Sequence, residues 1–324
     1  MKNYYQIIES EMLQVNECIL SHLHSKEELV EVVAKYLLNS GGKRIRPSLT
    51  LLCAGLCGYN GSAHIKLAAA AEFIHAATLL HDDVVDNSNM RRFQKSANVV
   101  WGNKTSILVG DFLFSQSFKM MVDAGSLEAL SRLSSASVRI AEGEVVQLAR
   151  LSEKRMLSMD EYEQIIRSKT SELFSAACEA GGIIAGQDRG LSKKLGEFGA
   201  RLGVIFQIVD DALDYFGKKE DLGKNIGDDF YEGKITLPII LLRDRLTNSE
   251  KSFLDSAFFL DVRSKEDFDK ILFMLSSHDI KTQIMDYVAR LVTEAADELD
   301  QIPGILLYKD SLKELLYHSS ARAN

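Results

Sequence analysis

The stretch LLHDDVVDNSNMRR, residues 79–92, places three aspartates within five positions, after an apolar run and before two arginines. Asp82, Asp83 and Asp86 stand at i, i+1 and i+4, so their side chains fall within about a 100° sector of one helix. Like charges at this spacing repel one another and destabilise a helix. The stretch therefore predicts a helix whose end needs concentrated negative charge for a function.

The same spacing recurs in QIVDDALDYFG, residues 207–217, where the acidic positions are Asp210, Asp211 and Asp214. Both clusters follow apolar residues and lie near expected helix ends, where the helix dipole disfavours negative charge. A solvated acidic surface explains one such cluster about as well as a metal site does, but it explains two poorly. Two clusters that face each other across a cavity would offer oxygen ligands to several Mg²⁺ ions that also bind substrate phosphates.

The rest of the chain has the pattern of a helical protein. Its 324 residues contain three prolines, strand signals are weak, and no Pro/Gly/Ser linker divides it. We expect one all-α domain, residues 1–324, folded as a helical bundle with an elongated apolar cavity at its centre. The expected helices span 65–86, 105–121, 127–148, 159–180, 191–215, 235–246, 265–275 and 280–299.

Composition narrows the function classes. With 46% apolar and 26% charged residues the chain has the balance of a water-soluble globular protein, and a net charge of −8 argues against a nucleic-acid partner. The first residues, MKNYYQIIESEM, are too polar for a signal peptide, and no apolar run reaches membrane-spanning length. Four irregularly spaced cysteines predict reduced thiols, so we expect a cytoplasmic protein.

Basic and polar residues lie both in the breaks between the expected helices and on the helices that carry or adjoin the acidic clusters. Arginine and lysine bind phosphate oxygens, and arginine does so through two parallel donors. Each of these residues alone is explained as surface charge or, for the histidine, as an ordinary core residue. Together they predict two diphosphate sites, one bridged by metals and one held directly by cationic side chains. The residues are Lys43, Arg46, His75, Arg91, Arg92, Lys169, Thr170, Gln207, Lys224 and Lys234.

Seven motifs in this order resemble those of the trans-type prenyl diphosphate synthases, most closely the long-chain group that makes octaprenyl diphosphate. The resemblance covers residues 41–242. It implies an all-α isoprenoid-synthase fold, a homodimer, and Mg²⁺-dependent head-to-tail condensation of isopentenyl diphosphate with an allylic diphosphate, farnesyl diphosphate being the expected starter. The product would serve as a quinone side chain. The motifs are GGKRIRP, FIHAATLLHDDVVDNSNMRR, ILVGDFLF, IAEGEVVQL, SKTSELF, FQIVDDALDYFG and GKNIGDDFYEGKITLPII.

The resemblance also implies roles for the site residues. Three Mg²⁺ ions per active site would be bound by Asp82, Asp86 and Asp210, with Asp83, Asp211 and Asp214 completing the clusters. The allylic diphosphate would contact Arg91, Lys169, Thr170, Gln207, Lys224 and Lys234, of which Lys169, Thr170, Gln207 and Lys224 are expected to act in catalysis. Isopentenyl diphosphate would be held by Lys43, Arg46, His75 and Arg92. The sequence departs from the family after MRR, where Phe93 replaces the usual glycine. The resemblance therefore does not fix the path of this loop or the placing of Arg92, and the catalytic assignment is kept.

Residues upstream of Asp82 bear on product length. Ala77 and Thr78 are small, whereas short-chain members of the family place bulky aromatics there, about one turn below the metals. The resemblance to octaprenyl synthases places Phe118 farther down, with Met121 and Leu133 as the cavity floor, although these residues also suit an ordinary core. Each added five-carbon unit buries about 4 kcal/mol of apolar surface. Release of a long product is therefore expected to be slow and to involve peripheral contact with a membrane.

Three alternatives stay open: a shorter-chain synthase that makes geranylgeranyl or farnesyl diphosphate, a class I terpene cyclase, and a non-catalytic subunit. The cyclase motif requires Ser or Thr four residues after Asp210 and Glu eight residues after it, but Asp214 and Lys218 stand there. A non-catalytic subunit is expected to lose its acidic clusters, and both are complete. In the C-terminal YHSSARAN, Arg322 could reach a diphosphate, but a frayed tail is the expected structure.

Overall fold

The structure, a computed structural model, describes residues 4–217, 226–260 and 262–323, and it confirms the predicted all-α fold. Four helices precede the first acidic cluster. They are α1 (Tyr4–Ile7), α2 (Glu9–His22), α3 (Glu28–Asn39) and α4 (Ile45–Leu56).

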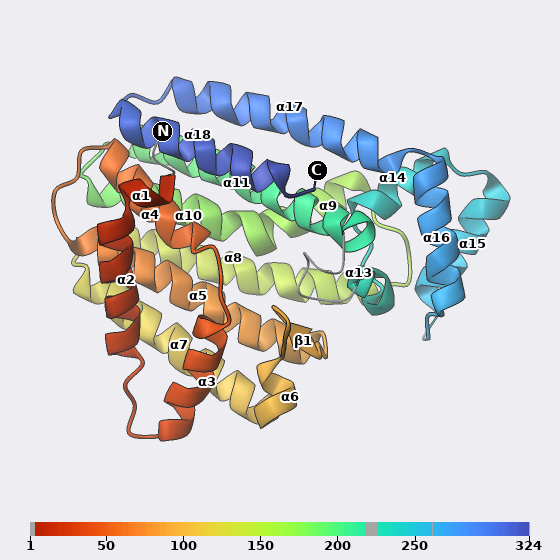
Figure 1. Cartoon of the computed structure of the whole chain (residues 1–324), viewed down its shortest axis with the longest axis horizontal. Helices are drawn as coiled ribbons and strands as arrows, with labels where there is room; N and C mark the ends of the chain where they lie inside the picture. The colour runs from red at the N-terminus through yellow and green to blue at the C-terminus, as the bar shows by residue number, and fades with distance from the viewer. Residues whose placement is uncertain (1–3, 218–225, 261, 324) are drawn as a thin grey trace.

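The centre of the molecule is built from five long helices that run side by side (Figure 1). In this group α5 packs along α7, and α10 packs along α11 and α4. They are α5 (Ala63–Val85), α7 (Asn103–Asp123), α8 (Leu127–Ser152), α10 (Glu172–Ile184) and α11 (Arg189–Phe216).

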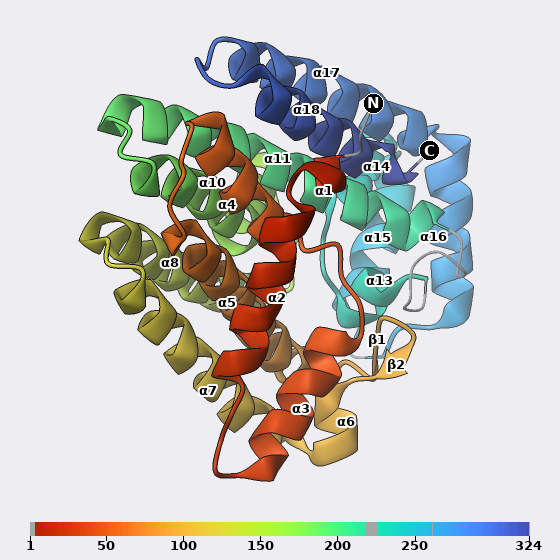
Figure 2. The same cartoon turned by 60° about the vertical axis from the view of Figure 1, so that its left-hand side comes forward.

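The remaining elements cover this centre or project from it. Helices α17 and α18 lie over α11, while α15 and α16 project at one end (Figures 1 and 2). These outer elements are α6 (Ala97–Trp101), α9 (Met159–Ile166), α13 (Asp228–Glu232), α14 (Leu237–Arg245), α15 (Asn248–Phe259), α16 (Lys265–Ser277), α17 (Ile280–Asp300), α18 (Leu306–Ser320) and the 3₁₀ turn η2 (Ala321–Ala323).

The π-helical turn and the hairpin are two of the features that depart from the predicted elements. The helix expected over 159–180 is broken by a π-helical turn, η1 (Arg167–Ser171), between α9 and α10. Strands β1 (Met90–Arg91) and β2 (Gln94–Lys95) form a short antiparallel hairpin where a loop was expected. The hairpin is too short to leave an alternating pattern in the sequence.

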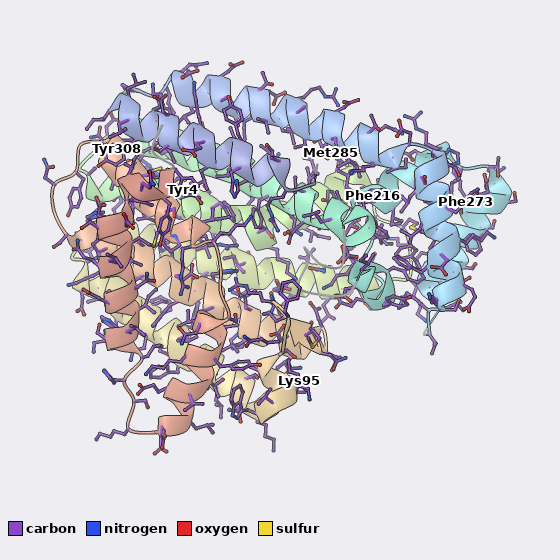
Figure 3. The ribbon with its side chains drawn as sticks, in the orientation of Figure 1. Tyr4, Lys95, Phe216, Phe273, Met285 and Tyr308 are labelled. Atoms are coloured by element: carbon purple, nitrogen blue, oxygen red, sulfur yellow. The ribbon has the colours of Figure 1, made fainter. Side chains whose placement is uncertain are left out.

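The molecule has two distinct ends. Both acidic clusters lie at the C-terminal ends of their helices, α5 and α11, on the side where the hairpin and α13 lie (Figure 1). The α7–α8 and α17–α18 turns lie at the opposite end of the molecule. In Figure 3, Tyr308 is labelled near these turns, and Lys95 is labelled on the hairpin. Among the described residues, no helix combines the length and apolar character required to span a bilayer.

Side-chain caps determine where the central helices begin. The Asp188 carboxylate accepts bonds from the backbone N–H groups of Gly190 (2.7 Å) and Leu191 (3.0 Å), which starts α11. Ser158 starts α9 through a capping box with Glu161. Such caps satisfy the first N–H groups of a helix and typically contribute about 1 kcal/mol each. They fix the register in which α9 and α11 present their polar side chains.

Candidate active site

The first acidic cluster contains one buried carboxylate, Asp83, and two half-buried ones, Asp82 and Asp86. Asp83 is 1% exposed, and its oxygens accept bonds from Arg91 Nη2 at 2.6 Å and Nε at 2.9 Å. Asp86 is paired with Lys234 at 2.7 Å, and Lys234 also contacts Glu232 at 2.6 Å. Arg91 and Lys234, both predicted to bind the allylic diphosphate, therefore lie at the first cluster.

Asp82 is the least compensated carboxylate of this cluster. Burial, together with the negative charges of Glu144 and Asp86, raises its pKa to about 7, although Lys169 and Arg91 oppose the shift. The ionised form of this carboxylate is therefore disfavoured in the protein alone. A bound divalent cation would favour the ionised form, because its positive charge reverses the sign of the local potential.

The second cluster also contains buried carboxylates and a more accessible one. Asp211 is buried and accepts bonds from Tyr162 Oη (2.6 Å) and Gln207 Nε2 (2.7 Å), and Thr170 Oγ1 donates to Gln207 Oε1 at 2.7 Å. Asp214 is fully buried and accepts the backbone N–H of Asp229 at 3.0 Å, at the start of α13. Asp210 is the exposed member of the three, with 43% of its side chain accessible.

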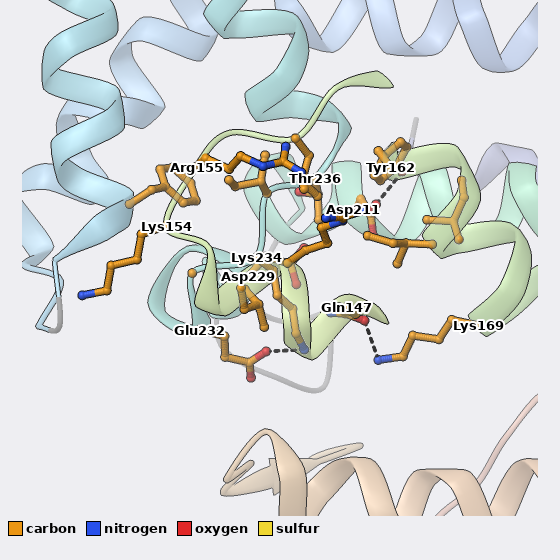
Figure 4. Close-up of a pocket in the computed structure, with 18 of the residues that line it drawn as sticks. Gln147, Lys154, Arg155, Tyr162, Lys169, Asp211, Asp229, Glu232, Lys234 and Thr236 are labelled. Atoms are coloured by element: carbon orange, nitrogen blue, oxygen red, sulfur yellow. Dashed lines mark hydrogen bonds and ion pairs between the residues drawn. The ribbon is translucent and has the colours of Figure 1, made fainter. Parts of the chain in front are cut away.

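The π-helical turn η1 places Lys169 and Thr170 on the wall of the site. Lys169 Nζ lies 2.7 Å from Glu144 Oε2 and 2.9 Å from Gln147 Oε1 on α8, the latter contact being drawn in Figure 4. Gly203 of α11 permits this packing, because a Cβ there would lie 2.5 Å from the Cα of Ser171. A π turn shifts the direction of the following side chains, and such turns are frequent at functional sites.

Residues predicted to hold the second diphosphate also lie close to one another. Arg46 lies over the ring of Phe174 at 4.7 Å, and burial lowers its pKa to about 10. Burial and the charges of Arg46 and Arg92 hold the pKa of His75 well below its usual value, so its ring is neutral at pH 7. The neighbouring Arg44 is occupied differently, since Nη1 pairs with the buried Glu72 at 2.5 Å.

Gly42 and Arg92 connect the GGKRIRP loop to the hairpin. Gly42 has φ = +154°, and a Cβ at this position would lie 2.8 Å from Arg92 Nη1. Arg91 and Arg92 are adjacent in sequence, yet one pairs with Asp83 and the other packs against this loop. That Arg91 and Arg92 address different diphosphates stays a prediction.

The hairpin also shows what the Phe93 substitution changes. Arg92 and Phe93 form its turn with φ values of +50° and +66°. This left-handed conformation favours glycine and is strained for other residues. The backbone thus keeps the turn that glycine would make, and the Phe93 side chain is 64% exposed.

The C-terminal residues were predicted wrongly. Instead of fraying, η2 packs against α11, and Arg322 Nη2 lies 3.0 Å from Asp210 Oδ1. The Arg322 guanidinium also lies over the Phe206 ring at 4.9 Å. The prediction failed because the order of a chain end depends on the surface against which it packs, and the local sequence does not show that surface.

Two cavities adjoin this arrangement. The larger, about 350 Å³, has Lys169, Thr170, Gln207 and Asp211 on one wall and residues of α15 on the other (Figure 4). The second, about 290 Å³, is lined by Asp86 and Glu144 among others, and Lys234 lies in both. Lys169, Thr170, Gln207 and Lys234 of the predicted allylic site thus border open volume, whereas Arg91 lines neither cavity.

The chain-length residues lie in the core between α5, α7 and α8. Ala77, Met121 and Leu133 are buried, and neither cavity described above is lined by them. Thr78 Oγ1 donates to the carbonyl of His75 at 2.9 Å, and Phe118 meets Phe114 edge-on. Both are partly buried, and the role of these residues in setting the product length stays a prediction.

The fit of the aspartates to Mg²⁺ can be judged from their surroundings. No three His, Cys, Asp or Glu side chains converge on one point among the residues that the structure describes. Mg²⁺ commonly takes one or two carboxylates and completes its octahedron with water and substrate phosphate, so this arrangement fits a shared ion. Asp82, Asp86 and Asp210 are the accessible candidates. Lys224 lies outside the described residues.

Several neighbours of the site were not predicted from the sequence. Tyr162, Glu144 and Gln147 hold Asp211 or Lys169, and Glu72 neutralises Arg44. A signal available in the sequence was the motif IAEGEVVQL, residues 140–148, which contains Glu144 and Gln147. The other contacts join residues far apart in the sequence.

An all-α bundle in which two aspartate clusters meet two groups of cations belongs to the class of enzymes that join diphosphate-bearing substrates. The Polyprenyl synthetase family model matches residues 27–275, and the chain belongs to this family. It is therefore a prenyltransferase with the isoprenoid-synthase fold.

Individual relatives agree with this assignment. The chain is 46% identical to octaprenyl diphosphate synthase of Escherichia coli K12 over 72% of each protein. It is 38% identical to the Haemophilus influenzae octaprenyl diphosphate synthase over 98% of this chain and 95% of that one. A polyprenyl synthase from Caulobacter crescentus, solved with calcium and isoprenyl diphosphate, superposes with a TM-score of 0.94 at 41% identity, covering 99% and 97% of the two chains. Other matched relatives carry the names of nonaprenyl and heptaprenyl synthases.

Proposed function

We propose that this enzyme makes trans-octaprenyl diphosphate by adding isopentenyl diphosphate units to farnesyl diphosphate, and that the product becomes a quinone side chain. The observation that carries the proposal is the divergence of Arg91 and Arg92 between the first aspartate cluster and the GGKRIRP loop. It supports two adjacent diphosphate sites, one on each side of the hairpin. The similarity to octaprenyl synthases supports the product length.

The chemistry follows from the charges. Breaking the allylic C1–O bond leaves both bonding electrons on the diphosphate, and bound Mg²⁺ would neutralise part of that charge. Lys169, Lys234 and Arg91 supply further positive charge at the leaving group. The double bond of isopentenyl diphosphate then forms the new bond to C1, and the proton lost from its C2 passes to the released diphosphate.

A network of hydrogen bonds beside Lys169 holds the side chains of the allylic diphosphate site in one arrangement. Thr170, Gln207 and Asp211 form a continuous hydrogen-bonded chain that ends on Tyr162. Because each member is oriented by the next, little reorganisation is needed as charge develops. Neutral His75, beside Arg46 and Arg92, would donate to the second diphosphate without adding repulsion.

Partners and location belong to the same proposal. Exposed Val138, Val145 and Leu148 lie along one side of α8, and exposed Leu108 is on the neighbouring α7. An apolar face of this kind suits a homodimer interface. The enzyme would work in the cytoplasm, use Mg²⁺ with three ions per site, and touch the membrane peripherally to release its product.

The test is a prenyl-transfer assay on the purified chain with farnesyl diphosphate, isopentenyl diphosphate and Mg²⁺. Lengthened linear prenyl diphosphates are expected, and either chelation or Asp82→Asn should lower the rate at least 100-fold. Arg189→Met, at the far end of α11, serves as the control. A cyclic product formed without isopentenyl diphosphate, or activity only after a second chain is added, would contradict the proposal.

A further inference from the structure

The hairpin and helix α6 carry a group of exposed apolar and basic side chains, which we call the hairpin patch. Its residues come from the hairpin, from α6 and from the first turn of α7, and these elements lie side by side (Figures 1 and 2). The four apolar members are 40% to 64% exposed, and the two lysines are exposed as well. The patch consists of Met90, Phe93, Lys95, Val99, Val100 and Lys104.

This part of an acidic chain is basic. No aspartate or glutamate occurs between Asp86 and Asp111, whereas two arginines and two lysines do, although the whole chain has a net charge of −8. The arginines are directed toward the protein, since Arg91 pairs with Asp83 and Arg92 lies against the GGKRIRP loop. The two lysines are left on the outside, so the charge that the patch presents to solvent is positive.

Phe93 is the most exposed apolar side chain of the patch and stands at the turn of the hairpin. Its backbone has φ = +66°, a conformation that is strained for phenylalanine. Because the ring is 64% exposed, little burial within this chain compensates for the strain. A strained residue that the fold does not require is a sign of function. The geometry therefore points to burial of the ring against something outside the chain.

We propose that the hairpin patch docks on a bilayer that contains anionic phospholipids, with Phe93 inserted between the lipids and Lys95 and Lys104 at their phosphate groups. An apolar tip flanked by cations matches the boundary between acyl chains and charged headgroups. A protein partner fits this surface less well, because a stable protein–protein interface takes about 20 to 30 residues from each side. The six residues of the patch fall short of that size.

Docking through this patch determines which end of the enzyme meets the membrane. The hairpin is tied to the first aspartate cluster by the bonds of Arg91 to Asp83, so the membrane surface would lie beside the opening of the active site. The inference rests on the proposed function, in which a product with a long apolar tail leaves the enzyme. It adds the surface and the lipid class through which the enzyme makes that contact.

The experiment is sedimentation of the substrate-free full chain with vesicles of phosphatidylcholine alone or mixed with phosphatidylglycerol. The unaltered protein should bind the mixed vesicles. Phe93→Gly should weaken that binding about tenfold, and Lys95→Gln and Lys104→Gln about fivefold each. Glycine adopts the conformation of the turn without strain, so the Phe93 variant stays folded.

Leu306→Ser is the matched control, because Leu306 is 66% exposed at the start of α18, at the opposite end of the molecule. It should bind the mixed vesicles as the unaltered protein does. High salt should weaken the contribution of the lysines and leave that of Phe93 nearly unchanged, because salt screens charges but does not weaken apolar burial.

Three results would overturn the inference. The first is that the unaltered protein binds no protein-free vesicles, even if it binds membranes that keep their proteins, since the patch would then serve a protein partner. The second is unchanged binding by Phe93→Gly. The third is loss of binding by Leu306→Ser alone, which would place the membrane at the opposite end.

Failure of the proposed function gives a different result. Product length is measured separately, in detergent and without vesicles. Short products together with vesicle binding that depends on Phe93 would contradict the proposed product and leave the docking surface in place.

Discussion

Asp83 and Arg91 form a two-point ion pair in which a carboxylate that is 1% exposed holds a guanidinium beside the first aspartate cluster. Two charge-assisted bonds fix the direction of Arg91 before any substrate arrives. Asp83 is therefore a positioning residue. The adjacent Asp82 and Asp86 are left as the candidates for direct metal coordination.

Asp83→Asn should lower the free energy of unfolding by about 3 kcal/mol, because Arg91 would stay largely enclosed without its counter-ion. Asp86→Asn should cost less, since Lys234 retains Glu232 as a partner. Urea unfolding of both variants measures the difference. Equal costs would show that the burial of Asp83 does not determine its role.

The stability of the metal-free protein should fall as pH rises from about 4 to about 7. Asp82 has a folded pKa of about 7, above the ordinary value near 4 of the unfolded chain. Between these values the folded protein binds a proton that the unfolded chain has lost, so raising the pH favours unfolding by up to about 4 kcal/mol. Asp82→Asn should flatten this part of the profile; an unchanged slope would assign it to other groups.

Gly42→Ala should raise the KM for isopentenyl diphosphate about tenfold and leave the KM for farnesyl diphosphate nearly unchanged. The new methyl group would displace the Arg92 guanidinium, which is 2.8 Å away. Gly41→Ala is the matched control, because Gly41 also has a positive φ (+89°) but has no atom within 4 Å of its added Cβ. Similar kinetics in both variants would mean that the backbone, rather than Arg92, sets the affinity.

Phe93→Gly should stabilise the protein by about 1 kcal/mol, since glycine adopts φ = +66° without strain. Because the exposed side chain contributes little burial, activity should be retained. Denaturant unfolding checks the gain. A loss of stability would show that Phe93 makes a contact in solution that outweighs its strain.

Ala77→Tyr should shorten the product and Met121→Ala should lengthen it. Ala77 and Met121 are both buried in the core beside the expected path of the growing chain. Tyrosine at position 77 would close that path about one turn below the aspartates. Mass spectrometry of the products reads out both changes, and identical lengths in both variants would remove these residues from length control.

The position of the site was predictable from the sequence. Which aspartates are held by other residues, and which stay accessible, was not. The spacing of Asp210, Asp211 and Asp214 places all three on one helical sector, as found. Tyr162 and Asp229 then occupy two of them. These partners come from other elements, so no local pattern identifies which carboxylate stays accessible.

There are also physical reasons why some elements of the fold were not predicted. Helix α4 is buried over ten of its twelve residues, so it lacks the alternation of apolar and polar faces that reveals a helix. The π turn that carries Lys169 depends on the close approach of Gly203 to Ser171, a contact across 32 positions. The prediction of one domain over residues 1–324 stays a prediction.

The central claim is the length of the product. Purified enzyme should be incubated with farnesyl diphosphate, excess isopentenyl diphosphate, Mg²⁺ and phospholipid vesicles that accept the product, and the dephosphorylated alcohols should be identified by mass spectrometry. The account predicts a main product of eight isoprene units. A main product of three or four units, with no longer chains as isopentenyl diphosphate is increased, would contradict it.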